Sequence, residues 1–210
     1  MVTMSRLPRR FFARPTVLVA RELLGQRLVH LAGGQRLAGL ITETEAYVGP
    51  TDLACHARAG RTPRTAVMYG PPGVAYVYFN YGLHWMLNVI TEPEDMPAAV
   101  LIRGVVVTEG EALAHQRRGR AGAAPLERLT DGPAKLAQAF GLDRANNGQD
   151  LCAPAATLFF ERAAAVPPAQ VQAGPRIGLG RSVPEPWLSQ PWNFRVPAGF
   201  FTHTLASPSG

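Results

Sequence analysis

Two glutamates and a tyrosine alternate along one short segment of the sequence, Ile41-Thr42-Glu43-Thr44-Glu45-Ala46-Tyr47. In an extended strand every second side chain projects from the same face, so Glu43, Glu45 and Tyr47 would share one side. A carboxylate can deprotonate water and stabilise positive charge on a sugar carbon. The segment therefore predicts acid–base chemistry beside an aromatic ring, and a solvated strand face is the plain structural alternative.

A second aromatic segment, Tyr76-Val77-Tyr78-Phe79-Asn80-Tyr81-Gly82, follows later in the chain. Its alternation places Tyr76, Tyr78 and Asn80 on one face. We expect Tyr76 to be a core residue rather than a site residue. Another apolar run begins directly after Gly82, so we expect Tyr81 at the exposed tip of a tight hairpin. Aromatic rings near an acid suit the binding of a flat heterocycle and the cleavage of its bond.

The segment between these two strands, residues 49–72, is rich in Gly, Pro, Thr and Arg and has no periodicity. Long loops in compact domains are usually functional, so we expect an ordered surface loop. It carries His56, Arg58, Arg61 and Arg64. An ordinary loop histidine is the alternative interpretation of His56.

Arginine supplies nearly all of the positive charge, because the net charge is +6 and Lys135 is the only lysine. Guanidinium groups bind phosphate through two parallel hydrogen bonds, which favours a nucleic-acid partner; the codon bias of a GC-rich genome is the alternative. Cys55 and Cys152 form no C-x-x-C pair, so neither a disulfide framework nor a zinc site is indicated. We expect a cytoplasmic protein with no membrane span.

The elements that position these groups can be predicted from periodicity and turn residues. A chain of 210 residues with 47% hydrophobic content suits one domain, residues 1–210, with disordered tails at 1–6 and 205–210. We expect strands at 27–31, 36–47, 74–80, 83–90, 98–107, 157–161, 176–179 and 193–196, helices at 16–24, 108–117 and 133–140, and a connection at 119–124. Hairpins with inserted helices predict an α+β fold around a curved, mainly antiparallel sheet resembling an open barrel.

Three further details concern individual residues or pairs of residues. Arg103 interrupts an apolar strand, where a guanidinium is costly to bury unless a carboxylate meets it; Glu45 or Glu43 is the natural partner. Thr108 and Glu111 have the spacing of a capping box. Trp187 and Trp192 lie among prolines and are expected to be packing anchors.

Several motifs occur in a defined order along nearly the whole chain. They are Glu43-Thr44-Glu45-Ala46-Tyr47 with Gly49-Pro50, Asp52, His56, Arg61-Thr62-Pro63-Arg64, Tyr76-Val77-Tyr78 with Tyr81-Gly82, Asn88, Leu101-Ile102-Arg103, Gly132-Pro133 with Lys135-Leu136, and Pro175-Arg176-Ile177-Gly178. In this order they resemble the alkyladenine (3-methyladenine) DNA glycosylase family of base-excision repair. The resemblance implies a single mixed α/β domain without metal or organic cofactor, acting as a monomer on damaged double-stranded DNA.

The resemblance also implies roles for the residues that would perform the reaction. Glu45 matches the general base that activates the water attacking C1′ of the deoxyribose. Arg103 and the backbone carbonyl of Ile177 match the groups that hold this water. The implied activity is hydrolysis of the N-glycosidic bond of 3-methyladenine, 7-methylguanine, hypoxanthine or ethenoadenine, which leaves an abasic site.

By the same resemblance, the base pocket comprises Tyr47, His56 and Tyr78, which would stack on and contact the flipped base, and Asn88, which would obstruct the 2-amino group of normal guanine. Tyr81 matches the wedge that enters the minor groove. Four more residues are expected at the DNA surface: Arg61, Arg64, Leu83 and His84.

Two other functions compete with this interpretation. A glycoside hydrolase could use Glu43 and Glu45, whose Cα atoms would lie roughly 6.6 Å apart on one strand face, but neutral sugars gain nothing from arginines. A non-catalytic nucleic-acid-binding module would explain the charge and the aromatic residues, but not Glu45. Lys135 falls within a predicted helix, so amine-based lyase chemistry is not expected.

Overall fold

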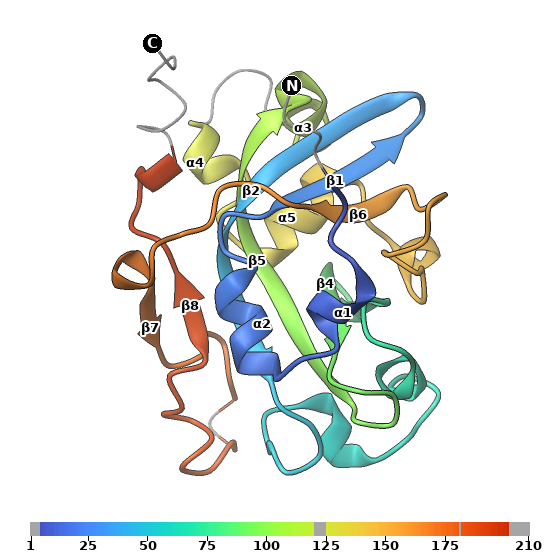
Figure 1. Ribbon diagram of the computed structural model, residues 1–210, viewed down its shortest axis with the longest axis vertical. Helices are drawn as coiled ribbons and strands as arrows, with labels where there is room; N and C mark the ends of the chain where they lie inside the picture. Colours follow the sequence, from blue (N-terminus) through green and yellow to red (C-terminus); the bar gives the residue numbers. More distant parts are fainter. Residues whose placement is uncertain (1–4, 120–124, 181, 202–210) are drawn as a thin grey trace.

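The computed structural model describes residues 5–119, 125–180 and 182–201, and Figure 1 shows their arrangement. Residues 1–4 and 205–210 of the expected tails, and residues 120–124 of the expected connection, lie outside the described residues. Two residues of the expected N-terminal tail form hydrogen bonds with the rest of the chain: the Ser5 carbonyl accepts from the Arg162 N–H (2.8 Å), and Arg6 donates to the carbonyls of Ala153 (2.6 Å) and Ala156 (3.1 Å).

The fold is α+β, built on one curled antiparallel sheet in the form of a half-barrel, as the sequence predicts (Figure 1). Eight strands form this sheet in the described residues, with the order β3-β4-β5-β2-β1-β6, and with β8 beside β2 and β7 beside β8. The strands are β1 (Arg27–Ala32), β2 (Gln35–Tyr47), β3 (Ala75–Asn80), β4 (His84–Thr91), β5 (Ala98–Glu109), β6 (Leu158–Glu161), β7 (Gln172–Gly174) and β8 (Asn193–Arg195).

Strand β2 is the longest strand and has different neighbours along its length. On one edge, the first half of β2 pairs with β1 and residues 43–45 pair with β8. On the other edge, β2 pairs with β5 along most of its length. The register with β5 shifts around Glu43, which marks a bulge. The two glutamates therefore lie in the middle of the sheet, between β5 and β8.

The helices are short and lie around this sheet: α1 (Arg9–Phe12), α2 (Thr16–Glu22), α3 (Glu111–Arg117), α4 (Leu126–Leu129) and α5 (Pro133–Phe140). Helix α5 spans the predicted residues 133–140, with Pro133 in its first turn and Gly141 in the left-handed conformation at its end. Short 3-10 helices occur at His56–Ala59, Ala66–Tyr69, Arg144–Asn146 and Pro168–Gln170. In the described part of the chain, none of the helices has the length and apolar character needed to cross a membrane.

Two predictions of local structure are wrong. Thr108 does not cap α3, because β5 continues through Glu109; Gly110 holds the cap position and the Thr108 hydroxyl donates to the Ala38 carbonyl. The predicted strand at 176–179 is absent, and the strand of this region is β7, which ends at Gly174.

The alternation of strand residues separates the main core from a second, smaller cluster. Ala75, Val77, Leu87, Val89, Val100 and Ile102 contribute to the main core, together with side chains of α1, α2 and α5. Residues of the opposite parity, Tyr76, Ile90 and Ala99, form a smaller cluster with Cys55, Ala57 and Met68 from the loop after β2. The face of the sheet that does not carry the main core is therefore available for a site.

Candidate active site

A cavity of about 470 Å³ opens on the face of the sheet that carries this smaller cluster. Its wall includes Tyr47 of β2, Tyr78 of β3, Asn88 of β4, Arg103 of β5, and His56 from the loop. Ligand pockets in proteins usually measure roughly 300–1,000 Å³, so this cavity can hold a small flat molecule.

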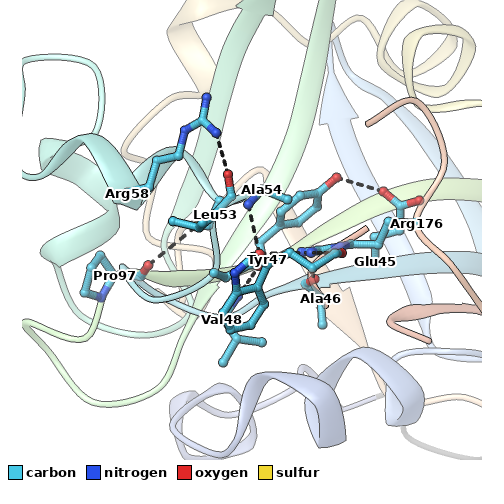
Figure 2. Close-up of polar contacts among 12 residues, drawn as sticks. Glu45, Ala46, Tyr47, Val48, Leu53, Ala54, Arg58, Pro97 and Arg176 are labelled. Atoms are coloured by element: carbon cyan, nitrogen blue, oxygen red, sulfur yellow. Dashed lines mark hydrogen bonds and ion pairs between the residues drawn. The ribbon is translucent and has the colours of Figure 1, made fainter. Parts of the chain in front are cut away.

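Glu45 is completely buried directly behind the cavity wall. Its Oε1 accepts hydrogen bonds from the backbone N–H of Ile177 (2.6 Å) and from Asn193 Nδ2 (3.1 Å), and its Oε2 accepts from the Tyr47 hydroxyl (2.9 Å) and from Arg103 Nη1 (3.4 Å). Figure 2 shows the Tyr47 ring projecting toward Glu45. Three of these donors belong to cavity-lining residues, so hydrogen bonds link the carboxylate directly to the cavity wall.

Arg103 joins the two glutamates, which confirms its predicted pairing. Its Nε donates to Glu43 Oε1 at 2.9 Å and its Nη1 to Glu45 Oε2. Burial lowers the pKa of Arg103, but the charges of Glu45 and Glu43 outweigh burial and raise it overall. A permanently charged guanidinium therefore lies between the two carboxylates.

The aromatic residues of the wall are held in their neutral forms. Burial, and then the charge of Glu45, raises the pKa of Tyr47 well above 10, and burial next to Tyr76 raises the pKa of Tyr78 to about 12. Burial, followed by the charges of Arg64 and Arg58, lowers the pKa of His56 to about 4. The wall can thus stack on a flat molecule and exchange hydrogen bonds with it near neutral pH.

Tyr76 and Asn88 are two further residues of this wall, since both line the cavity. Tyr76 belongs to the smaller cluster, as expected of a core residue, and its hydroxyl lies 3.0 Å from His56 Nδ1. Asn88 is buried, and its Nδ2 donates to the Tyr76 carbonyl at 3.2 Å. Both side chains are consequently fixed in orientation at the cavity.

Tyr81 lies at the tip of the β3–β4 hairpin, as predicted, and is 85% exposed. Tyr81 and Gly82 both have positive φ angles (49° and 66°), and the Leu83 N–H closes the turn on the Asn80 carbonyl at 3.0 Å. Tyr81 lines the cavity mouth, whereas Leu83 and His84 are exposed beside it and do not line the cavity.

The family model described as methylpurine-DNA glycosylase (MPG) matches residues 10–198, which is most of the chain. The chain belongs to the methylpurine-DNA glycosylase family. It is therefore a DNA glycosylase for alkylated bases and a DNA-repair protein.

Individual relatives of this glycosylase cover most of its length. A protein of Myxococcus xanthus named "Putative 3-methyladenine DNA glycosylase" is 47% identical over 193 residues, which is 92% of this chain and 91% of the relative. Proteins with the same name from Methanocella arvoryzae and Salinibacter ruber are 45% and 44% identical; the latter alignment covers 99% of this chain and 100% of the relative.

The two loop arginines expected at the DNA surface are exposed in this glycosylase, and neither lines the cavity. The Arg61 guanidinium lies 5.5 Å from the centre of the Tyr69 ring, and that of Arg64 lies 5.1 Å from the centre of the Tyr78 ring. Arg64 is therefore close enough to act on the pocket electrostatically as well as to face solvent.

Three residues that contact the site of this glycosylase received no individual role from the sequence. Asn193 Nδ2 lies 2.7 Å from Glu43 Oε1 and also bonds to Glu45; its position in a predicted strand gave no sign of this. Asp52 and Arg176 form an ion pair with completely buried side chains. Both occur in the ordered motifs of the chain, which was the only available signal.

Proposed function

We propose that the chain is a monofunctional DNA glycosylase that flips a damaged purine out of duplex DNA and hydrolyses its N-glycosidic bond with a water activated by Glu45. The substrates would be 3-methyladenine, 7-methylguanine, hypoxanthine and ethenoadenine in double-stranded DNA, and the enzyme would act as a cytoplasmic monomer. The observation that carries this proposal is a wholly buried carboxylate, bonded by four donors, immediately behind an aromatic cavity.

Base flipping is supported by the cavity and by the exposed hairpin tip. Extruding a base costs a few kcal/mol, and stacking on an aromatic side chain returns roughly 1–3 kcal/mol. Tyr47, Tyr78 and His56 supply such rings, and a positively charged alkylated base also gains from their π faces. Tyr81 would enter the duplex and occupy the space that the flipped nucleotide leaves.

Selection against normal guanine is assigned to Asn88. Its side chain is buried and anchored to the Tyr76 carbonyl, so it would not move aside for a 2-amino group. The neutral side chain of His56 would offer a hydrogen bond at the edge of the base, where deaminated and normal purines differ.

The hydrolytic step follows from the environment of Glu45. We place the attacking water beside Oε2, where the 3.4 Å contact with Arg103 is the longest of the four hydrogen bonds of the carboxylate. The carbonyl of Ile177, the residue whose N–H holds Oε1, would be the third group around this water. Glu45 would take the proton of the water and stabilise the oxocarbenium-like transition state, with the Arg103 guanidinium beside its Oε2.

Lyase activity is not part of the proposal. The only lysine, Lys135, lies on α5, and its Nζ contacts Asp131 at 2.6 Å. A lysine nucleophile would have to be near C1′, and Lys135 does not line the cavity. Borohydride should therefore trap no covalent complex with an abasic-site duplex.

The deciding experiment incubates the protein with duplexes that contain one lesion each and counts abasic sites. Wild-type protein should release the base, Glu45→Gln should bind the duplex without release, and Glu109→Gln on β5 should behave as wild type. Wild-type turnover in Glu45→Gln would contradict the assignment of the base. Binding of lesion duplexes without release by the wild-type protein would instead favour a binding module, and cleavage of glycosides without base release would favour a glycoside hydrolase.

A further inference from the structure

A buried ion pair lies next to the cavity wall, in contact with the ring of the cavity-lining residue Tyr47. Arg176 Nη1 and Nη2 donate to the two carboxylate oxygens of Asp52 at 2.5 and 2.9 Å, and neither side chain is exposed. Because its side chain is completely buried, Arg176 cannot contact a DNA phosphate. Its charge acts only inside the protein.

This pair connects the segments that carry the proposed site. Arg176 Nη1 also donates to the carbonyl of Ala46, the residue between Glu45 and Tyr47, at 3.0 Å (Figure 2). Asp52 accepts from the N–H groups of Val48 (3.1 Å) and Ala54 (3.0 Å). The pair therefore fixes the end of β2 and the start of the loop that holds His56.

The guanidinium also packs directly against the pocket wall. Its central carbon lies 4.8 Å from the centre of the Tyr47 ring and 5.0 Å from that of Trp192, so it is in contact with both rings. Its Nη2 donates to the Trp187 carbonyl at 3.1 Å, and the Trp187 and Trp192 rings are 6.1 Å apart. The two tryptophans, expected as packing anchors, thus hold Arg176 against the Tyr47 ring.

Stability alone does not explain this arrangement. A buried ion pair pays a large desolvation penalty, and apolar residues of similar volume often replace one without loss of stability. In addition, the Arg176 Nε is buried without a hydrogen-bond partner among the described residues, and such orphaned groups call for an explanation. The contacts that Arg176 makes with the proposed site offer a functional explanation for burying this ion pair.

We infer that Arg176 is a positioning residue, which together with Asp52 sets the alignment of Glu45 relative to the flipped base. Arg176 directly precedes Ile177, whose N–H bonds to Glu45 Oε1 at 2.6 Å, and it also backs the ring on which the base would stack. One guanidinium thereby links the general base and the base-binding wall. The inference rests on the proposed hydrolytic function and adds a residue to it.

The consequence is a specific effect on the chemical step. A displacement of about 1 Å in a catalytic group can cost about 10²-fold in rate. Loss of the Arg176 fork would free Ile177 and the end of β2 while the exposed wedge and the loop arginines remain. The rate of base release should therefore fall far more than the affinity for the lesion duplex.

The test compares Arg176→Lys, Arg176→Met and the double variant Asp52→Asn/Arg176→Met, each in the full chain. The double variant removes both charges together and should fold even if Arg176→Met does not. Single-turnover release from a hypoxanthine duplex gives the rate, and binding to a duplex with an uncleavable lesion analogue gives the affinity. The ¹H–¹⁵N signal of the Ile177 amide reports directly on its bond to Glu45.

We expect the double variant to release base about 10²-fold more slowly, with affinity within a few fold of wild type and with a shifted Ile177 amide signal. Arg176→Lys, which keeps the charge but loses the fork, should fall in between. The control Arg36→Met removes an arginine paired with Glu161 and Glu109 at the far end of β2, and should leave the rate unchanged.

A wild-type rate and an unshifted Ile177 signal in a folded double variant would overturn the inference. Equal losses of rate and affinity would also overturn it, since they would indicate a general structural role. Glu45→Gln serves as the reference. If Glu45→Gln abolishes base release while the Arg176 variants release base at the wild-type rate, only the inference fails. If Glu45→Gln keeps full activity, the proposed function itself fails.

Discussion

Asn193 on β8 is the direct pairing partner of Glu45 on the neighbouring strand β2, and Asn193 Nδ2 lies 3.1 Å from Glu45 Oε1. The same Nδ2 lies 2.7 Å from Glu43 Oε1. A single amide thus donates to both carboxylates, which Arg103 also joins. The β2–β8 pairing brings Asn193 to the two glutamates, and no local pattern in the sequence predicts this contact.

Replacing Asn193 with Ala should destabilise the protein and slow base release. Hydrogen bonds to charged groups contribute about 1.5–3 kcal/mol, so the free energy of unfolding should fall by about that much. Urea denaturation measures the change. Asn147→Ala, which removes an acceptor for the Val77 N–H, is the control for loss of a neutral bond and should leave release unaffected. An unchanged stability of Asn193→Ala would contradict the bridging role.

The ion pair of Arg103 with Glu45 should show strong coupling in a double-mutant cycle. Arg103→Met leaves two carboxylates without their cation and should cost about 3–5 kcal/mol of unfolding free energy. In a Glu45→Gln background the same replacement should cost less, with a coupling energy of about 0.5–3 kcal/mol. Urea denaturation of the four proteins gives the cycle. Additive effects would mean that the 3.4 Å contact carries no energy.

Tyr81→Ser should weaken binding to lesion duplexes without affecting the fold. The ring is 85% exposed, so its removal takes little from the core, while the proposed wedge loses its stacking with the duplex. Thermal unfolding should be unchanged, and fluorescence of a 2-aminopurine placed next to the lesion should report less flipping. Leu31→Ser on β1, which also removes an exposed apolar side chain, serves as the control. Unchanged affinity of Tyr81→Ser would refute the wedge role.

The protein should lose stability on acidification between pH 6.5 and 4 partly because of His56. Burial, then Arg64 and Arg58, lowers the pKa of folded His56 to about 4, whereas an unfolded histidine takes up its proton near pH 6.5. In this window the unfolded state binds the extra proton, so the folded state is disfavoured as the pH falls. In His56→Gln the free energy of unfolding, followed by urea denaturation, should fall less steeply with pH. Parallel slopes for the two proteins would contradict the prediction.

Gly39→Ala should destabilise the junction of the two long strands. A Cβ at Gly39 would lie 2.7 Å from the Val106 carbonyl oxygen and 3.2 Å from Val105 Cγ2, so β2 and β5 would have to separate. Overpacking of this kind typically costs about 1–3 kcal/mol, measurable by thermal or urea unfolding. Gly174→Ala is the control, because a Cβ there meets no atom within 4 Å. Equal stability of the two variants would show that the close approach is easily relieved.

Patterns within short stretches determined much of the architecture. Alternation in β2 and β3 predicted that Glu43, Glu45 and Tyr47 share a face, and that Tyr76 and Tyr78 do. The Gly after Tyr81 predicted the hairpin tip, and the charge inside an apolar strand predicted the Arg103 ion pair. These features are predictable because side-chain alternation, turn conformation and the cost of a buried charge act between neighbours or between adjacent strands.

Contacts between distant segments were decided only by the tertiary structure. Glu45 bonds to Ile177 and Asn193, which are 132 and 148 positions away, and the contact with Asn193 requires β8 to pair with β2. The segment at 176–179, predicted as a strand, instead uses its polar groups on Glu45 and Asp52. Local periodicity carries no information about such pairings, because the partner of a buried carboxylate depends on which segments the curled sheet brings together.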